Sequence, residues 1–225
     1  MKIDRHGQAK ILTQSEIQLL FSQGLQTNRD RVLFGVCLFS GCRIREACTL
    51  LTVDVYDRTG KVRPKLLLRK GNTKGKLATR TIPIIEDLRR LLTNYKPQAG
   101  QVYLFPGRSN GHISHDSAAR LLRQALERVG IEGASTHSFR RTALTQMSDA
   151  GIPLRVIQQV SGHRNLQHVQ NYIEVREEQV LGAVSALSIL SPVTENVGKW
   201  IYHNLDSISL YPCLYALCQQ QHQLS

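Results

Sequence analysis

The sequence predicts a mainly α-helical fold that contains one small three-stranded antiparallel β-sheet. Helix-start and helix-stop signals recur along most of the 225 residues. In one region, three short segments typical of strands alternate with glycine-containing turns. Apolar residues make up 41% of the chain, which is enough for a hydrophobic core, so wholesale disorder is excluded.

The first helix is predicted from a capping box, Thr13-Gln14-Ser15-Glu16, in which two side chains satisfy free N–H groups. Its apolar face consists of Ile17, Leu20 and Phe21. Gly41 is expected to end the next helix, because glycine readily adopts the left-handed conformation that follows a last turn. The helices after the first are expected over residues 28–39, 44–50, 85–95, 116–129, 138–149, 154–160, 166–173 and 177–190.

The strands are expected over residues 52–56, 65–69 and 78–82. Pro83 is expected to close the last strand, because proline has no N–H to donate to a ladder. The joining turns are predicted from Arg58-Thr59-Gly60 and from residues 71–75.

The charge balance indicates a polyanionic partner. The formal net charge is +12, from 29 Lys and Arg against 17 Asp and Glu. Such an excess is typical of proteins that bind nucleic acid, and less often of proteins that bind an anionic membrane surface. Arginine accounts for 20 of the 29 basic residues, and its planar fork suits phosphate oxygens.

Cysteine usage and hydropathy exclude several classes of protein. The five cysteines are odd in number and contain no C-x-x-C pair, which argues against a disulfide scaffold and a structural zinc site. This pattern favours a reducing cytoplasm. The first ten residues lack the apolar core of a signal peptide, and no apolar run approaches the roughly 18 residues of a membrane span.

Three regions are expected along the chain. Residues 1–11 are polar and basic and are expected to form a flexible arm, and residues 12–192 form the main domain. Residues 193–225 carry a net charge of −1, from one Lys and two acids, and form a C-terminal extension of unknown role. A poorly ordered extension and a segment that packs on a neighbouring subunit are both compatible with this composition.

Four short patterns are candidates for a chemical site, and each is weak by itself. In Ser40-Gly41-Cys42-Arg43-Ile44-Arg45-Glu46, a glycine ends one helix and Arg43 begins the next. A helix N-terminus attracts anions, so Arg43 can help to bind a phosphate. A surface Arg43 paired with Glu46 explains the same fragment, and both interpretations stay open.

Two further patterns contain histidine. In His137-Ser138-Phe139-Arg140, the histidine and the arginine share one helix face and can reach one ligand, although about 0.7 H-x-x-R matches are expected by chance in a chain of this composition. Gly162-His163 is followed nine residues later by Tyr172. A packed aromatic ring and a solvated histidine are the ordinary explanation of this last pattern taken alone.

The fourth pattern is the lysine-rich segment over residues 70–76, which is typical of an exposed turn and can also reach into a DNA groove. Competing motifs do not occur: the sequence has no P-loop, no nucleophile elbow, no H-E-x-x-H and no EF-hand loop. Asp54 and Asp57 lack the further carboxylates that a two-metal nuclease needs.

Taken in order, these patterns resemble the tyrosine recombinase (phage integrase) family. The resemblance covers about residues 10–190 and implies the catalytic-domain fold of that family, with site-specific cleavage and rejoining of DNA strands as the activity. The matching segments are Gly41 to Glu46, the hairpin that ends in Thr81-Ile82-Pro83, His137 to Arg141, and Gly162-His163-Arg164 with Tyr172.

The resemblance implies one active site around a scissile phosphate. Tyr172 is expected to attack the phosphate and form a covalent 3′-phosphotyrosine link, which retains the bond energy for rejoining. Arg43 and Arg140 are expected to bind the non-bridging oxygens, and His163 is expected to donate a further hydrogen bond. His137 is expected to act as the base for the tyrosine.

A hairpin lysine is expected to protonate the leaving 5′-oxygen. Lys74 is the choice, because it precedes Gly75, which lets the turn approach the DNA backbone closely. The resemblance implies no cofactor and no metal. Further candidates for contacts to DNA are Lys70, Lys76, Arg80, Arg141 and Arg164.

The chain looks more like the short, single-domain members that invert fimbrial promoter segments than like the two-domain members, since only about ten residues precede the family pattern. The expected partner is double-stranded DNA at the nucleoid, bound by a homo-oligomer (a tetramer), with an accessory DNA-binding protein as a further candidate. Residues 177–190 carry an apolar stripe that is expected either to dock on a neighbouring protomer or to pack on its own domain. A DNA-binding member without recombination activity and a topoisomerase-like nicking and resealing enzyme remain the alternatives.

Overall fold

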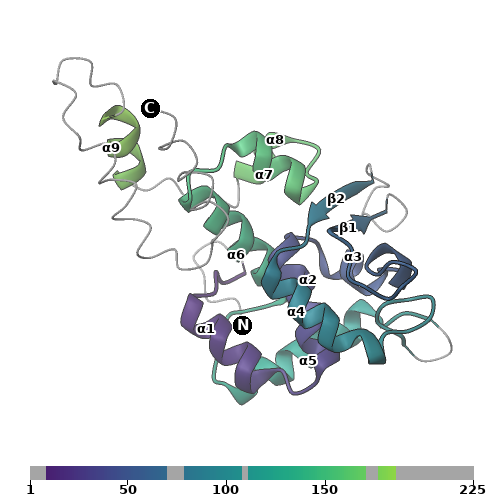
Figure 1. Ribbon diagram of the computed structural model, residues 1–225. Coiled ribbons are helices and arrows are strands. Elements are labelled where there is room, and N and C mark those ends of the chain that lie inside the picture. The colour runs from purple at the N-terminus through teal and green to yellow at the C-terminus, as the bar shows by residue number, and fades with distance from the viewer. Residues whose placement is uncertain (1–8, 70–78, 108–110, 171–176, 186–225) are drawn as a thin grey trace, which may run out of the picture. The chain divides into compact units, whose positions relative to one another are not determined.

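The computed structural model describes residues 9–69, 79–107, 111–170 and 177–185 (Figure 1). Its contacts divide the chain into two units, residues 1–174 and 175–225. The helices of the first unit are α1 (Gln14–Leu19), α2 (Asn28–Ser40), α3 (Ile44–Cys48), α4 (Glu86–Tyr95), α5 (His115–Arg128), α6 (Thr136–Asp149), α7 (Leu154–Ser161) and α8 (Leu166–Gln170). The strands are β1 (Lys65–Leu68) and β2 (Arg80–Pro83), and the second unit is described by α9 (Glu177–Ser185).

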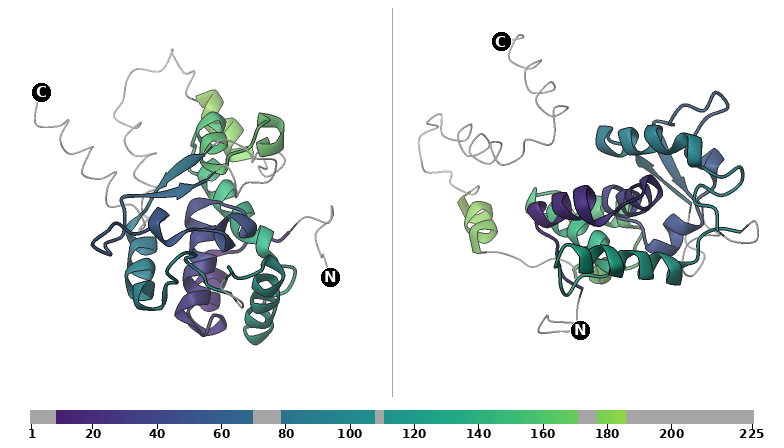
Figure 2. Two further views of the ribbon diagram at one scale, coloured as in Figure 1. Left: turned by 90° about the vertical axis from the view of Figure 1, so that its right-hand side faces the viewer. Right: turned by 90° about the horizontal axis from the view of Figure 1, so that it is seen from below.

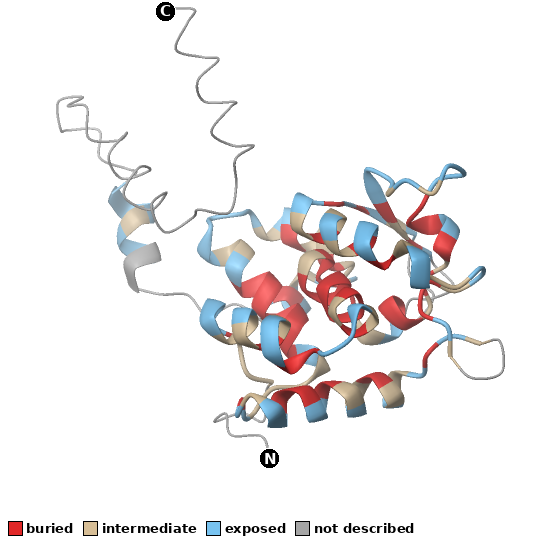
Figure 3. Cartoon of the chain, turned by 60° about the horizontal axis from the view of Figure 1, so that its bottom comes forward, coloured by how far each residue is buried: buried red, intermediate tan, exposed pale blue. Residues whose placement is uncertain are grey.

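Helix α2 forms the centre of the core of the first unit. Its side chains are apolar on nearly every face, and Leu33, Phe34 and Val36 are completely buried. Helices α4 and α6 pack against it (Figure 2). Figure 3 shows that buried residues face the interior, while exposed residues lie on the outer faces of the helices. The Phe34 ring stacks on Phe139 of α6 with 5.3 Å between ring centroids.

The local signals for helix ends are confirmed. At the start of α1, the N–H of Glu16 donates to Thr13 Oγ1 and the N–H of Thr13 donates to Glu16 Oε2, which is the predicted capping box. Gly41 ends α2 with φ at +59°, a left-handed conformation that glycine adopts at little cost. The other expected helices are also present within the described residues, although those over 166–173 and 177–190 extend beyond them.

The small sheet pairs β1 and β2 in antiparallel register, as predicted, with Leu66 opposite Ile82. Leu66, Leu68 and Ile82 are buried, so this face of the hairpin packs on the core. Arg80, the first residue of β2, contacts Glu46 of α3 and Val160 of α7. Residues 70–78, which connect the two strands, lie outside the described residues.

The prediction of a strand over residues 52–56 is wrong, because this segment contains a 3₁₀ turn, Thr52–Asp54. The N–H groups of Val55 and Tyr56 both donate back to the Thr52 carbonyl instead of to a neighbouring strand. Thr52 Oγ1 also donates to the Gly100 carbonyl at 2.5 Å, which fixes the start of the turn. The sheet therefore has two strands among the described residues, and the fold is mainly helical as expected.

The expected flanking regions are described only in part. Residues 1–8 of the arm lie outside the described residues, while the N–H of Lys10 donates to the Gly133 carbonyl and the N–H of Leu12 donates to Thr142 Oγ1. Residues 193–225 and the expected boundary at residue 192 also lie outside them. Within the part of the chain that is described, no helix is long and apolar enough to cross a membrane.

Candidate functional site

The candidate site forms where the turn before α3, the middle of α6 and the end of α7 meet, and Arg140 connects the three. This side chain lies in α6 and is only 1% exposed. Its Nη1 donates to the Gly41 carbonyl at 2.6 Å, and its Nη2 donates to the Ser161 carbonyl at 2.8 Å. Burying a guanidinium is costly unless acceptors surround it, so these carbonyls fix its position and orientation.

His163 lies directly against Arg140. Its Nε2 is 2.9 Å from Arg140 Nη2, and its Nδ1 is 2.8 Å from Ser161 Oγ. A guanidinium has no acceptor, so Nε2 accepts from Arg140, and Nδ1 carries the proton and donates to Ser161. Burial, together with the positive charges of Arg140 and Arg43, lowers the pKa of His163 from 6.5 to about 3. The imidazole is therefore neutral near neutral pH.

The lowered pKa of His163 predicts acid sensitivity of the fold. Because the unfolded chain binds this proton near pH 6.5 and the folded chain only near pH 3, the stabilisation is fully present above 6.5 and is lost progressively as the pH falls. Urea unfolding midpoints at about pH 7 and about pH 5 should fall more for the wild type than for His163→Gln. Equal falls in both proteins would contradict the assignment.

Arg43 precedes α3, and a buried glutamate holds it there. The N–H of Arg43 donates to Glu46 Oε2 at 2.8 Å, and Arg43 Nη1 is 3.7 Å from Glu46 Oε1. The Glu46 side chain is 1% exposed and the Arg43 side chain is 25% exposed. The Arg43–Glu46 pair, which was one of the two interpretations of this fragment, is present in the structure. Its carboxylate is buried, so it differs from an ordinary surface ion pair.

Glu46 is also bound by a second arginine. Arg80 Nη1 and Nη2 donate to the two carboxylate oxygens of Glu46 at 3.1 and 2.9 Å. Burial by itself would raise the pKa of Glu46, but the hydrogen bonds and charge of Arg80 and the N–H of Arg43 hold it below its usual value. The carboxylate therefore stays ionised and keeps both arginines in place.

The other predicted residues fall in different surroundings. His137 is exposed in the first turn of α6, three residues before Arg140 and hence on the same helix face. Arg141 is buried and donates to the Ala9 carbonyl, while Arg164 is exposed just after His163. The structure thus brings together Arg43, Arg140 and His163, with His137 one turn away. Outside the described residues lie Lys70, Lys74, Lys76 and Tyr172.

Two residues for which the sequence predicts no role help to hold this site together. Ser161 binds His163 through its hydroxyl, and Gln158 Nε2 donates to the carbonyls of His163 and Arg164 at 3.1 Å each. Both lie in the last turn of α7, just before the left-handed Gly162. The only local signal was the position of a serine directly before that glycine.

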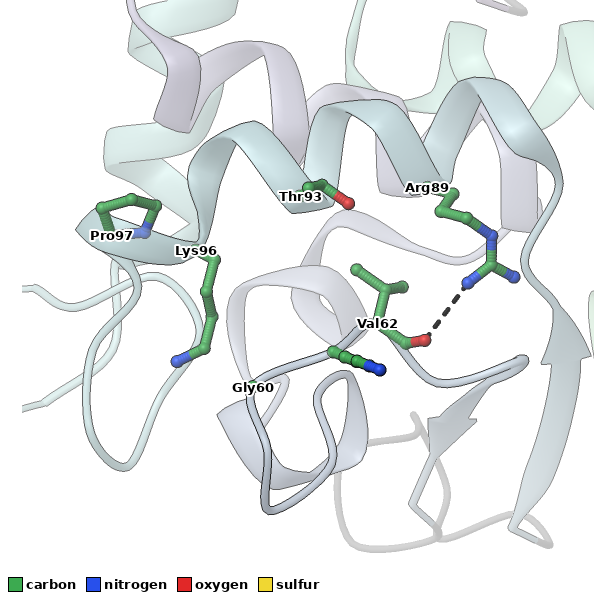
Figure 4. A pocket seen from close by; sticks show the side chains of 7 residues that line it. Gly60, Val62, Arg89, Thr93, Lys96 and Pro97 are labelled. Atoms are coloured by element: carbon green, nitrogen blue, oxygen red, sulfur yellow. Dashed lines mark hydrogen bonds between the residues drawn. The ribbon is translucent and has the colours of Figure 1, made fainter.

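The described residues also form a pocket of about 540 Å³ between the 58–62 turn and α4 (Figure 4). Val62, Arg89, Thr93 and Lys96 line it, and Arg89 Nη1 donates to the Val62 carbonyl. None of the described candidate site residues lines this pocket. The candidate site is recognised by its converging side chains.

The chain is similar in sequence to several tyrosine recombinases. The chain is 28% identical over 180 residues to a tyrosine recombinase of Pseudothermotoga lettingae, which covers 78% of this chain and 60% of that protein. It is 30% identical over 161 residues to tyrosine recombinase XerC of Corynebacterium glutamicum, covering 69% of this chain and 49% of the relative. The match thus spans from about half to three fifths of the length of these relatives.

A crystal structure of XerA recombinase has the same fold, with a TM-score of 0.66 at 20% identity, covering 81% of this chain and 66% of that one. The family model described as the phage integrase family matches residues 10–179, which is most of this chain and includes every candidate site residue. Because this match spans well over half of the sequence, the chain belongs to the phage integrase family.

Proposed function

We propose that this protein is a site-specific recombinase that cleaves and rejoins DNA strands through a covalent 3′-phosphotyrosine intermediate. One observation carries the proposal: Arg140 contacts both His163 and the Gly41 carbonyl, which precedes Arg43 by two residues. Three sequence motifs thereby place two guanidinium groups and an imidazole in one location. Such a cluster suits a phosphodiester, because it can stabilise the charge that grows on the non-bridging oxygens.

The arginines supply the electrostatic part of this reaction. Arg140 is held by backbone carbonyls, so it need not reorganise when the phosphate charge increases. Arg43 is partly exposed and can reach a ligand from the start of α3. A bound phosphate would raise the pKa of His163, because an opposite charge favours the protonated ring. The protonated ring would then donate from Nε2 to the phosphate in place of accepting from Arg140.

The nucleophile and the two proton carriers complete the proposal. We assign the attack to Tyr172, with His137 as its base, because a free tyrosine has a pKa near 10 and needs help to ionise near neutral pH. We assign protonation of the leaving 5′-oxygen to Lys74. The exposed position of His137 in the first turn of α6 supports its access to a group outside the core.

Double-stranded DNA is the proposed partner. The net charge of +12 supports binding to the phosphate backbone. Solved relatives include recombinases and an integrase that are bound to DNA.

The experiment uses duplexes from the genomic DNA that flanks the gene, where inverted repeats or a tRNA attachment site would identify the substrate. The protein is incubated with these duplexes and with a supercoiled plasmid that carries them. Exchanged strands together with a denaturation-resistant adduct support recombination. Relaxed plasmid without exchange indicates a topoisomerase-like activity, and bound DNA without any adduct indicates a DNA-binding member that does not recombine.

We also propose that the protein acts as a homo-oligomer, a tetramer on DNA, in which part of residues 177–190 docks on a neighbouring protomer. In α9, the apolar side chains of Val180, Leu181 and Val184 are 51%, 67% and 59% exposed, which supports a role in contacts between protomers. An accessory DNA-binding protein remains part of the proposal.

Truncation after Arg176 tests the docking of this segment. The truncated protein should bind a single DNA site as the full chain does, but two sites should no longer pair, because the docking segment is missing. Native gels that resolve one-site and two-site complexes measure both properties. Insoluble truncated protein would contradict docking in trans, because it would indicate that the segment packs on its own domain.

A further inference from the structure

We propose that Arg80 is a positioning residue that sets the placement of Arg43 relative to the Gly162–His163 turn, and that it does not contact DNA. The expected change in reaction rate rests on the proposed function. The expected change in amide hydrogen exchange can be measured without any reaction. Arg80 begins β2, at the end of the hairpin, and its side chain is only 10% exposed.

The guanidinium of Arg80 joins two segments that carry candidate site residues. Two of its nitrogens bind the carboxylate of Glu46, whose Oε2 also accepts from the Arg43 N–H. Its third nitrogen, Nε, donates to the Val160 carbonyl at 3.1 Å, at the end of α7. One planar group therefore links the start of α3 to the turn that precedes His163.

Gly162 packs directly on the same guanidinium. A Cβ atom at this position would lie 2.9 to 3.1 Å from Nη1, Cζ and Nε of Arg80, which is too close for a side chain. The residue also has φ at +66°, which favours glycine. The backbone of Gly162 therefore packs closely on the Arg80 guanidinium, which also bonds the Val160 carbonyl, so we expect the position of His163, the next residue, to depend on that guanidinium.

Glu46 explains why Arg80 should not bind a phosphate. If Arg80 turned toward DNA, it would leave the buried carboxylate of Glu46 without its bidentate partner, and an uncompensated buried charge is strongly unfavourable. We therefore expect the loss of Arg80 to slow the chemical step and to leave DNA binding nearly intact.

The experiment compares Arg80→Gln and Arg80→Lys with Arg69→Gln as the matched control. Arg69 also holds a buried carboxylate, with Nε 2.7 Å from Asp54 Oδ2, and it follows the other strand of the hairpin. Single-turnover adduct formation on nicked duplex is measured at saturating protein, and DNA affinity is measured over a range of salt concentrations.

Arg80→Gln should form the adduct roughly tenfold more slowly or worse, since small misplacement of reacting groups is costly. Its DNA affinity should stay within about threefold of the wild type, with an unchanged slope of log affinity against log salt. Arg69→Gln should keep the wild-type rate. A slope smaller by about 0.9 with an unchanged cleavage rate would overturn the proposal, because that is the signature of one lost phosphate contact.

Arg80→Lys keeps a cation beside Glu46, so it tests the proposal even where the glutamine variant fails to fold. Lysine lacks the fork that reaches Glu46 and Val160 together, so Arg80→Lys should also form the adduct more slowly. A wild-type rate would overturn the proposal.

Amide hydrogen exchange over residues 160–163 without DNA should accelerate in both Arg80 variants and not in Arg69→Gln. If the wild type forms no adduct, the proposed function fails, and unchanged exchange would still overturn the positioning role.

Discussion

Tyr172→Phe should abolish the denaturation-resistant protein–DNA adduct while leaving DNA affinity almost unchanged. Phenylalanine keeps the aromatic ring but removes the only oxygen that can form the phosphodiester link, so no residual covalent product is expected. The variant is incubated with a nicked suicide duplex, from which the cleaved end diffuses away, and the adduct is counted on a denaturing gel.

Other tyrosines serve as controls for this result. The hydroxyls of Tyr56 and Tyr95 donate to the carbonyls of Leu92 and Leu104, and burial raises the pKa of Tyr95 to about 12. Such phenols are poor nucleophiles, because they ionise less readily than a free tyrosine. Tyr103→Phe, at a partly exposed tyrosine, should retain the adduct. An adduct that persists in Tyr172→Phe would overturn the assignment of the nucleophile.

Lys74→Ala should cleave ordinary DNA roughly 10²- to 10⁴-fold more slowly, which is the usual contribution of general acid catalysis. The physical reason is that a leaving alkoxide needs a proton, whereas a leaving thiolate does not, because a thiol is several pKa units more acidic than an alcohol. A substrate with sulfur at the 5′-bridging position should therefore restore much of the rate to this variant. Single-turnover cleavage of the two substrates measures the rescue.

Lys70→Ala and Lys76→Ala are the matched controls, because they remove the same charge from the same hairpin. Both should bind DNA more weakly and gain no particular advantage from the sulfur substrate. Rescue of either one, together with the absence of rescue in Lys74→Ala, would transfer the role of general acid to another lysine. The assignment of Tyr172 as nucleophile would not be affected.

Signals that act over a few residues predicted most of the helices. The capping box of Thr13 and Glu16 forms as expected, and Gly41 takes the left-handed conformation that ends α2. These features depend on neighbours in the chain, so they can be read from the sequence. The prediction of a strand over residues 52–56 failed because the conformation of this segment depends on a distant residue. Its composition is typical of a strand, but Thr52 donates a hydrogen bond to the carbonyl of Gly100, which is 48 residues away.

The sequence by itself determined the family resemblance and the order of Arg43, His137, Arg140, His163 and Tyr172, because each lies in a short pattern of fixed spacing. Only the tertiary structure decided which charged residues are internal. Arg80 and Arg164 are the same residue type, yet one is bound to a buried glutamate 34 residues away and the other is exposed. Composition and spacing carry no information about such distant partners, because burial is decided by how β2, α3 and α7 pack together.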